Sequence, residues 1–143
     1  MQLKRDTDYA LRILMCAAEQ KKNKKSFSGG LTIQEISART GMPRVSVDRI
    51  CRCLEKSKLI VKATGVRGEN VYFADDRTPE LSLLEIIEAV EKETQLFAVF
   101  DKKSDMYRMH EAFFREVQLE IEKTLSEATV EKITNANIFH KKR

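Results

Sequence analysis

Tryptophan is absent from the sequence, and proline, glycine, cysteine and histidine are scarce, at two, five, three and two of 143 residues. No run of about 18 apolar residues occurs, so we expect no transmembrane helix. The first twenty residues carry too many charges and too short an apolar run for a signal peptide. Three cysteines are an odd number, and without an export signal we expect reduced thiols in a cytoplasmic protein.

Residues that carry catalysis are sparse as well. Both histidines, His110 and His140, lie in the C-terminal third, and we find neither a phosphate-binding loop nor a nucleophile motif. Acidic residues are scattered along the expected helix faces instead of being paired at one site. We therefore expect that the protein is not an enzyme.

Charge, by contrast, is abundant, at 34% of the residues beside a hydrophobic share of 42%. This balance and the length predict one domain with its own core and an appended helix. Residues 1–73 hold 15 Lys and Arg against 7 Asp and Glu, a net of +8, whereas residues 74–143 hold 11 against 15, a net of −4. A basic first half favours binding to a polyanion, and the acidic second half is expected to have a different role.

The stretch from residue 31 to residue 57 predicts two short helices joined by a tight turn. Thr32 and Glu35 have the spacing of a capping box, so a helix should begin at Thr32. Gly41 suits the left-handed residue that ends such a helix, and Pro43 suits the first turn of the next one. This arrangement is typical of a DNA-binding helix-turn-helix, although an ordinary helical hairpin would show the same spacing.

The second of these helices is expected to be amphipathic. Its apolar stripe consists of Val47, Ile50, Cys51 and Leu54. A helix that buries one side and presents guanidinium groups on the other suits a DNA major groove, whereas a solvated charged face is the plain alternative. The face opposite the stripe carries Arg44, Ser46, Asp48, Arg49, Arg52 and Cys53.

A β-hairpin is predicted directly after this helix. Two runs of β-branched, aromatic and other apolar residues, 59–63 and 71–73, flank a glycine-bearing turn. Arg67 lies between Gly65 and Gly68, so the tip can approach DNA closely and Arg67 can enter a minor groove as part of a wing. An exposed hairpin arginine without a role in DNA binding is the alternative.

The first helix is expected from Asp8 to Gln20, with Thr7 or Asp6 as its cap. Lys4 and Arg5 precede it. They are placed to contact phosphate, or else they belong to a solvated tail.

A polar break at residues 75–80 divides a predicted winged domain, residues 1–80, from residues 81–143. Ser82 and Glu85 form a second capping box, so another helix should begin there and run to about Glu93.

The longest helix is predicted from Asp105 to Glu127, about 30 Å of helix. A small winged domain cannot cover that length, so we expect its apolar stripe to pack on a second copy of the chain. The aromatic loop before it, residues 96–100, is where we would place a site for a small-molecule or protein effector. The predicted dimer seam consists of Met106, Met109, Phe113, Val117, Ile121 and Leu125.

Four segments occur in serial order: LKRDTDYALRIL, TIQEISARTGMPRVSVDRICRCLEKSKLI, the predicted wing and LSLLEIIEAVEKE. Together they resemble the Rrf (type two) family of bacterial transcriptional regulators, the family of IscR, NsrR and CymR, and the likeness extends to the closing EATVEKI. The resemblance implies a winged helix-turn-helix homodimer whose long helices cross between subunits and whose recognition helices address a palindromic operator. It also implies that DNA is contacted from the positions of Arg44, Val45, Ser46, Asp48 and Arg49.

The sequence departs from that family in three places. Many members hold an iron–sulfur cluster on three cysteines before the long helix, but no cysteine occurs from Thr94 to Arg143, so we expect no cofactor and a cluster-free branch. Thr64 stands where the family often has an arginine before the wing's first glycine, and Arg67 is the residue that would replace it. Lys58 stands where the family has a glycine after the recognition helix.

The sequence therefore predicts a mainly α-helical protein with a small β-hairpin wing that binds double-stranded DNA as a homodimeric repressor. A winged-helix protein-interaction module is one alternative. A thiol or small-ligand sensor, whose DNA binding is secondary, is another. For the latter, Cys53 is the candidate redox thiol, because nearby basic side chains favour a thiolate; an inert thiol is the plain reading.

Overall fold

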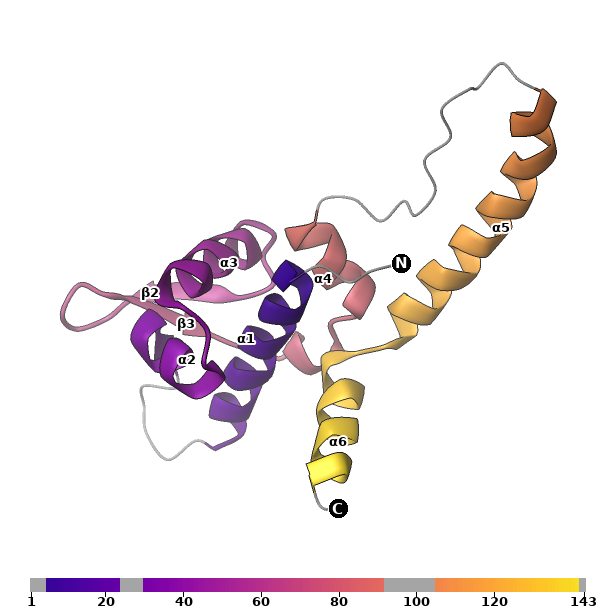
Figure 1. The fold of residues 1–143 in the computed structure, drawn as a ribbon. Coiled ribbons are helices and arrows are strands. Elements are labelled where there is room, and N and C mark those ends of the chain that lie inside the picture. The colour runs from indigo at the N-terminus through magenta and orange to yellow at the C-terminus, as the bar shows by residue number, and fades with distance from the viewer. Residues whose placement is uncertain (1–4, 24–29, 92–104, 142–143) are drawn as a thin grey trace.

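The structure of the chain is a computed structural model that describes the backbone at residues 5–23, 30–91 and 105–141, and the side chains there except at 105–111 and 137–141. Helices dominate this part of the chain, with a small sheet between them (Figure 1). The elements are α1 (Arg5–Lys22), β1 (Leu31–Thr32), α2 (Ile33–Thr40), α3 (Arg44–Lys56), β2 (Val61–Thr64), β3 (Asn70–Phe73), the 3-10 helix η1 (Thr78–Glu80), α4 (Leu83–Val90), α5 (Asp105–Glu127) and α6 (Val130–Lys141).

The turn between α2 and α3 has the predicted chemistry. The Thr32 hydroxyl accepts a hydrogen bond from the Glu35 amide, and the Glu35 carboxylate accepts one from the Thr32 amide, which completes the capping box. Gly41 ends α2 with φ of +75°, a conformation that costs glycine little. Pro43 occupies the N-cap position of α3. The helix-turn-helix prediction is confirmed at the level of the backbone.

The predicted apolar stripe of α3 is buried. It lies against α1, α2 and α4, so the opposite face is left to solvent. The buried side chains of α3 are the expected Val47, Ile50, Cys51 and Leu54.

The predicted hairpin forms, with β2 antiparallel to β3 and Val61 opposite Phe73. A third strand, β1, was not predicted, and it pairs with β3 so that Leu31 lies opposite Tyr72. Leu31 and Tyr72 are both fully buried. Two residues are too few for a strand pattern in sequence, and this strand exists because the hairpin offers an edge and the core accepts Leu31.

Helix α1 differs from the prediction in its start and in its buried face. It begins at Arg5, so neither Thr7 nor Asp6 is its cap, and that expectation was wrong. Thr7 is buried inside the helix, where its hydroxyl donates to the Glu91 carboxylate at 2.9 Å. Helices α2, α3, α4 and α6 all contact α1, which explains why its buried side is broad. Its buried residues are Thr7, Ala10, Ile13, Leu14 and Ala17.

The residues after the wing return to the same core. Helix α4 begins with the predicted capping box of Ser82 and Glu85, although it ends at Val90 and not near Glu93. The Val130 amide donates to the Leu81 carbonyl at 2.9 Å, and the side chains of Leu81 and Val130 are buried with those of α1 and α3. Residues 1–80 and 81–143 therefore share one core. Their division is a proposal about function, in which the first part binds DNA and the second forms the dimer.

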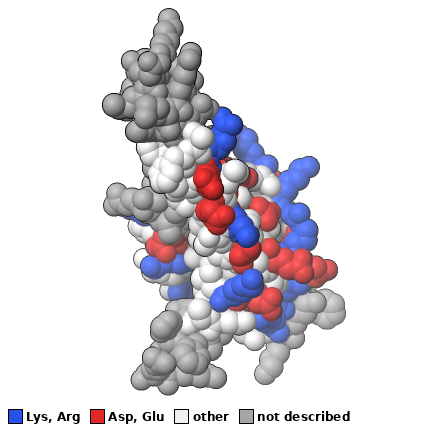
Figure 2. Space-filling model, turned by 90° about the vertical axis from the view of Figure 1, so that its right-hand side faces the viewer, with Lys and Arg blue, Asp and Glu red and all other residues white. Residues whose placement is uncertain are grey.

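Helix α5 has the predicted bounds and extends away from the body of the molecule as a rod (Figure 1). The chain then turns back into α6, a helix of 12 residues that was not predicted from the sequence. Figure 2 shows this side of the molecule, where acidic and basic side chains are interspersed with uncharged surface.

Candidate nucleic-acid interface

The solvent face of α3 carries the predicted DNA-contacting residues together. Arg44 and Val45 occupy its first turn, and Val45 is 81% exposed, an unusual position for an aliphatic side chain. Ser46 is half-buried beside them. The N-terminal residues of a recognition helix are those that reach base edges, so this turn presents both a guanidinium and methyl groups to a groove.

Two of the three arginines on this face are paired with carboxylates. Arg52 lies 2.9 Å from Asp48 one turn earlier on α3, an ordinary surface pair. Arg49 instead reaches Asp6 on α1, with distances of 2.8 Å from Nη1 to Oδ2 and 2.9 Å from Nη2 to Oδ1. These hydrogen bonds raise the pKa of Arg49. The sequence did not predict the Asp6 contact, because 43 residues separate the partners.

The wing is a tight hairpin whose tip is fully exposed. The Gly65 amide donates to the Glu69 carbonyl at 2.7 Å, and Gly68 adopts φ of +83°. Val66 and Arg67 lie at the tip with their side chains in solvent, and Thr64 is exposed on β2. The tip thus presents one apolar and one basic side chain, and both types occur among minor-groove binders.

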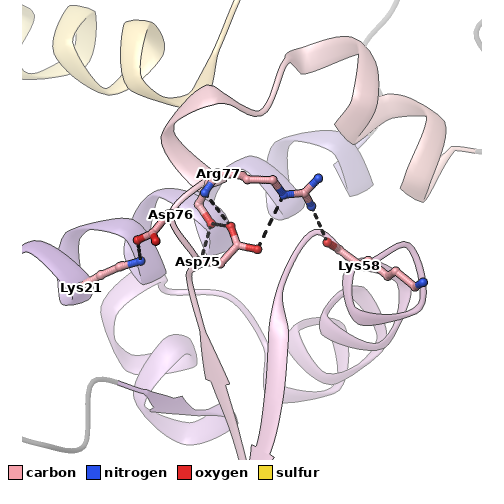
Figure 3. Close-up of polar contacts among 6 residues, drawn as sticks. Lys21, Lys58, Asp75, Asp76 and Arg77 are labelled. Atoms are coloured by element: carbon pink, nitrogen blue, oxygen red, sulfur yellow. Dashed lines mark hydrogen bonds and ion pairs between the residues drawn. The ribbon is translucent and has the colours of Figure 1, made fainter.

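A set of polar contacts joins the base of the wing to the end of α3 (Figure 3). Arg77 donates from Nη2 to the Lys58 carbonyl at 3.0 Å, and its backbone amide donates to Asp75 Oδ1 at 2.9 Å. Asp76 is paired with Lys21 of α1. Lys58 has φ of +61°, the left-handed conformation that favours glycine. The Arg77–Lys58 hydrogen bond thus links the residues after β3 to the end of the recognition helix.

The N-terminal basic residues are described only in part. Arg5 is exposed at the first turn of α1, whereas Lys4 lies outside the described residues. The loop at residues 96–100, named as a place for an effector, also lies outside them.

The thiols differ in their surroundings. Cys51 is buried, and desolvation raises its pKa to about 12, so it is an inert core residue. Cys53 is half-buried, near enough to Arg49 to act on the pKa of that arginine. Cys53 thus faces solvent only in part, although the sequence predicted it on the solvent face of α3.

Helix α5 carries apolar side chains that are exposed or half-buried. Phe113 is 63% exposed, and its ring packs edge-on against that of Phe114 at 5.9 Å between centroids. Val117, Ile121 and Leu125 are half-buried along the same stripe. The side chains of Met106 and Met109 are outside the described part of α5.

Helix α2, the turn, helix α3 and the β2–β3 hairpin define the chain as a winged helix-turn-helix protein. The sequence pattern of the Rrf2 family, described as an iron-dependent transcriptional regulator, matches residues 3–137. The chain therefore belongs to the Rrf2 family of transcriptional regulators. This membership confirms the sequence-based resemblance and the prediction that the protein is not an enzyme.

The regulators CymR and IscR, whose structures are solved, have the same fold as this chain. CymR of B. subtilis, its global cysteine regulator, gives a TM-score of 0.72 at 14% identity over 95% of this chain and 98% of that chain. IscR of T. potens gives 0.68 at 15% identity, covering 96% and 88%. The oxidized form of S. aureus CymR gives 0.64 at 16% identity, covering 94% and 96%. At such identities the likeness establishes the fold alone, and no curated protein matches the sequence.

The iron in the family's description requires a set of ligands that the described residues do not offer. The described residues contain no group of three or more His, Cys, Asp and Glu side chains that could hold a metal. The cysteines are Cys16, Cys51 and Cys53, all in the winged part of the chain, and Cys51 is enclosed by the core. Several thiolates must converge on an iron–sulfur cluster, so the donor set does not fit one. Within the described residues, no helix has the length and apolarity to cross a membrane.

Proposed function

We propose that the protein is a sequence-specific repressor that binds a palindromic operator as a homodimer, in the bacterial cytoplasm and without an iron–sulfur cluster. The observation that carries this proposal is the solvent face of α3, where Arg44 and Val45 are exposed in the first turn with the half-buried Ser46, beside a wing that ends in Arg67. Membership of a family of transcriptional regulators supports it.

The roles of the side chains follow from their chemistry. Arg44 carries a guanidinium in the first turn of α3, where it can donate two hydrogen bonds to the O6 and N7 atoms of guanine. Val45 offers methyl groups that suit the C5 methyl of thymine. Arg67, with Val66 beside it, suits a minor groove next to the half-site. Lys4, Arg5 and Arg52 then serve the phosphate backbone, and Asp48 orients Arg52.

The dimer is proposed from α5. Phe113 on this helix is a large apolar side chain that is 63% exposed, and a second copy of the same helix is the occupant that an isologous interface would supply. Two recognition helices related by a two-fold axis would address half-sites about one DNA turn apart. Repression follows when the bound dimer blocks polymerase.

Selection of bound duplexes from a random pool, followed by a salt titration on the selected duplex, tests this function. We expect a palindromic consensus and an affinity that falls steeply with salt, because each neutralised phosphate releases counterions. A scrambled duplex of the same length should bind at least about a thousandfold more weakly. Equal binding to both duplexes, or no binding, would instead favour a winged-helix module that contacts proteins.

A redox role of Cys53 is a hypothesis. Under this hypothesis, oxidation of the Cys53 thiol releases the protein from DNA. Its place near Arg49 is the supporting observation. Alkylation of Cys53 that leaves operator affinity unchanged would eliminate this role.

A further inference from the structure

Arg49 on the recognition helix is held by a carboxylate from another helix. Asp6, in the first turn of α1, accepts one hydrogen bond from each terminal nitrogen of the guanidinium, at 2.8 and 2.9 Å. Such a two-point contact fixes the plane of the guanidinium as well as its position. The neighbouring Arg52–Asp48 pair lies within one helix and involves one short contact, so it restricts the orientation of its guanidinium less.

The contact with Asp6 leaves a defined edge of Arg49 available. A guanidinium has five N–H donors, and the end-on contact uses one on each terminal nitrogen. The N–H of Nε and the adjacent terminal N–H remain as a parallel pair. Guanine presents O6 and N7 as two neighbouring acceptors in the major groove, which matches that pair. The Arg49 side chain is 52% exposed on the solvent face of α3, so it is not enclosed by the protein.

Asp6 itself stands on a well-supported part of α1. Its side chain is 29% exposed, and the next residue, Thr7, is buried and hydrogen-bonded to Glu91 at the end of α4. Ala10, one turn later, is fully buried. The start of α1 is thus anchored to α4 while its Asp6 side chain reaches α3. A carboxylate supported in this way can keep an arginine in one orientation.

We propose that Asp6 is a positioning residue for DNA recognition. It orients the free edge of Arg49 toward a guanine and prevents Arg49 from binding phosphates. This proposal rests on the proposed function, because it assumes that α3 enters a major groove. A carboxylate near the DNA repels phosphates, so Asp6 lowers affinity for every sequence and increases the difference between the operator and other duplexes.

Asp6→Asn, with Asp8→Asn as the matched control, tests this role. Asp8 lies two residues along the same helix and pairs with Arg12 at 3.1 Å, so both variants lose one negative charge near the start of α1. Each variant is assayed on the selected operator and on a scrambled duplex across a range of salt concentrations. Asp6→Ala is made in parallel, and circular dichroism checks that all variants are folded.

For Asp6→Asn we expect the operator-to-scrambled affinity ratio to fall at least about fivefold, because one bidentate base contact is lost. Binding to the scrambled duplex should tighten, and its salt slope should steepen by about one, as Arg49 turns to a phosphate. Asp8→Asn should leave the ratio and the slope unchanged. In an Arg49→Ala background, Asp6→Asn should no longer alter the ratio.

An unchanged ratio in Asp6→Asn, or the same change in Asp8→Asn, would overturn the positioning role and leave the proposed function intact. A change that persists without Arg49 would overturn it as well, since Asp6 would then act on DNA directly. Failure of the unaltered protein to distinguish the two duplexes would reject the proposed function itself.

Discussion

At the scale of single residues, Lys58 is the clearest case of local strain. It follows α3 with φ of +61°, and its side chain is exposed. A left-handed conformation costs an L-residue about 1–2 kcal/mol, which glycine avoids. The position is therefore one where a glycine suits the backbone better than the residue present.

Lys58→Gly should raise the free energy of unfolding by about 0.5–1 kcal/mol, because relief of the backbone strain exceeds the added entropy of the unfolded chain. Urea denaturation measures the change. Lys62→Gly is the control, since Lys62 is an exposed lysine on the regular strand β2 and its replacement should be destabilising. A destabilised Lys58→Gly variant would mean that contacts of the lysine outweigh the strain.

The cysteines should differ in reactivity. Burial raises the pKa of Cys51 to about 12, whereas its ordinary value is 9.0, so the folded protein retains that proton more firmly than the unfolded chain does. The stabilisation that follows is complete below pH 9 and is lost as pH rises from 9 toward 12. At pH 8 we expect iodoacetamide to modify Cys53 while Cys51 stays unmodified until the protein unfolds, as peptide mass spectrometry can measure. Early modification of Cys51 would show that the core opens locally.

At the scale of elements, α5 is a helix whose large apolar side chains are not covered within one chain. Phe113 and Leu119 are both large, apolar and more than half exposed, at 63% and 58%. They lie on different sides of the helix, because six residues correspond to about 240° of rotation. The predicted seam includes Phe113 and not Leu119.

Phe113→Asp should convert the proposed dimer to a monomer, because a buried, unpaired carboxylate is costly at an apolar interface. Leu119→Asp introduces the same charge on the same helix and should leave the dimer intact. Sedimentation velocity at micromolar concentration measures both. If Leu119→Asp separates the subunits and Phe113→Asp does not, the seam lies on the opposite side of α5.

At the scale of the whole molecule, the proposed function depends on two recognition helices acting together. A rigid dimer sets the distance and the rotation between its half-sites. Within one chain, the Arg77–Lys58 hydrogen bond joins the base of the wing to the end of the recognition helix, and the Thr7–Glu91 hydrogen bond joins α1 to the end of α4.

Insertion of five base pairs between the selected half-sites should abolish cooperative binding, since it rotates one half-site by about half a turn. Insertion of ten base pairs restores the face but adds about 34 Å between the half-sites, so a rigid dimer should lose cooperative binding to this duplex as well. Gel-shift titration of the three duplexes measures the effect. Equal affinity for all three would indicate that each subunit binds independently.

Much of this architecture was predictable from local chemistry. The capping boxes at Thr32 and Ser82, the left-handed Gly41 and the apolar stripe of α3 depend on residues three or four apart, so the sequence displays them directly. The bounds of α5 were predicted for the same reason.

The remainder depended on contacts between distant segments. The strand β1 needs the edge of β3, the true start of α1 needs the burial of Thr7 against α4, and α6 needs the surface of α1. The pairing of Asp6 with Arg49 belongs to the same class. The sequence by itself determined the helices α1 to α5 and which face of α3 is basic, because helical periodicity is local. Only the tertiary structure decided which carboxylate meets which arginine, because that depends on how α1 and α3 pack.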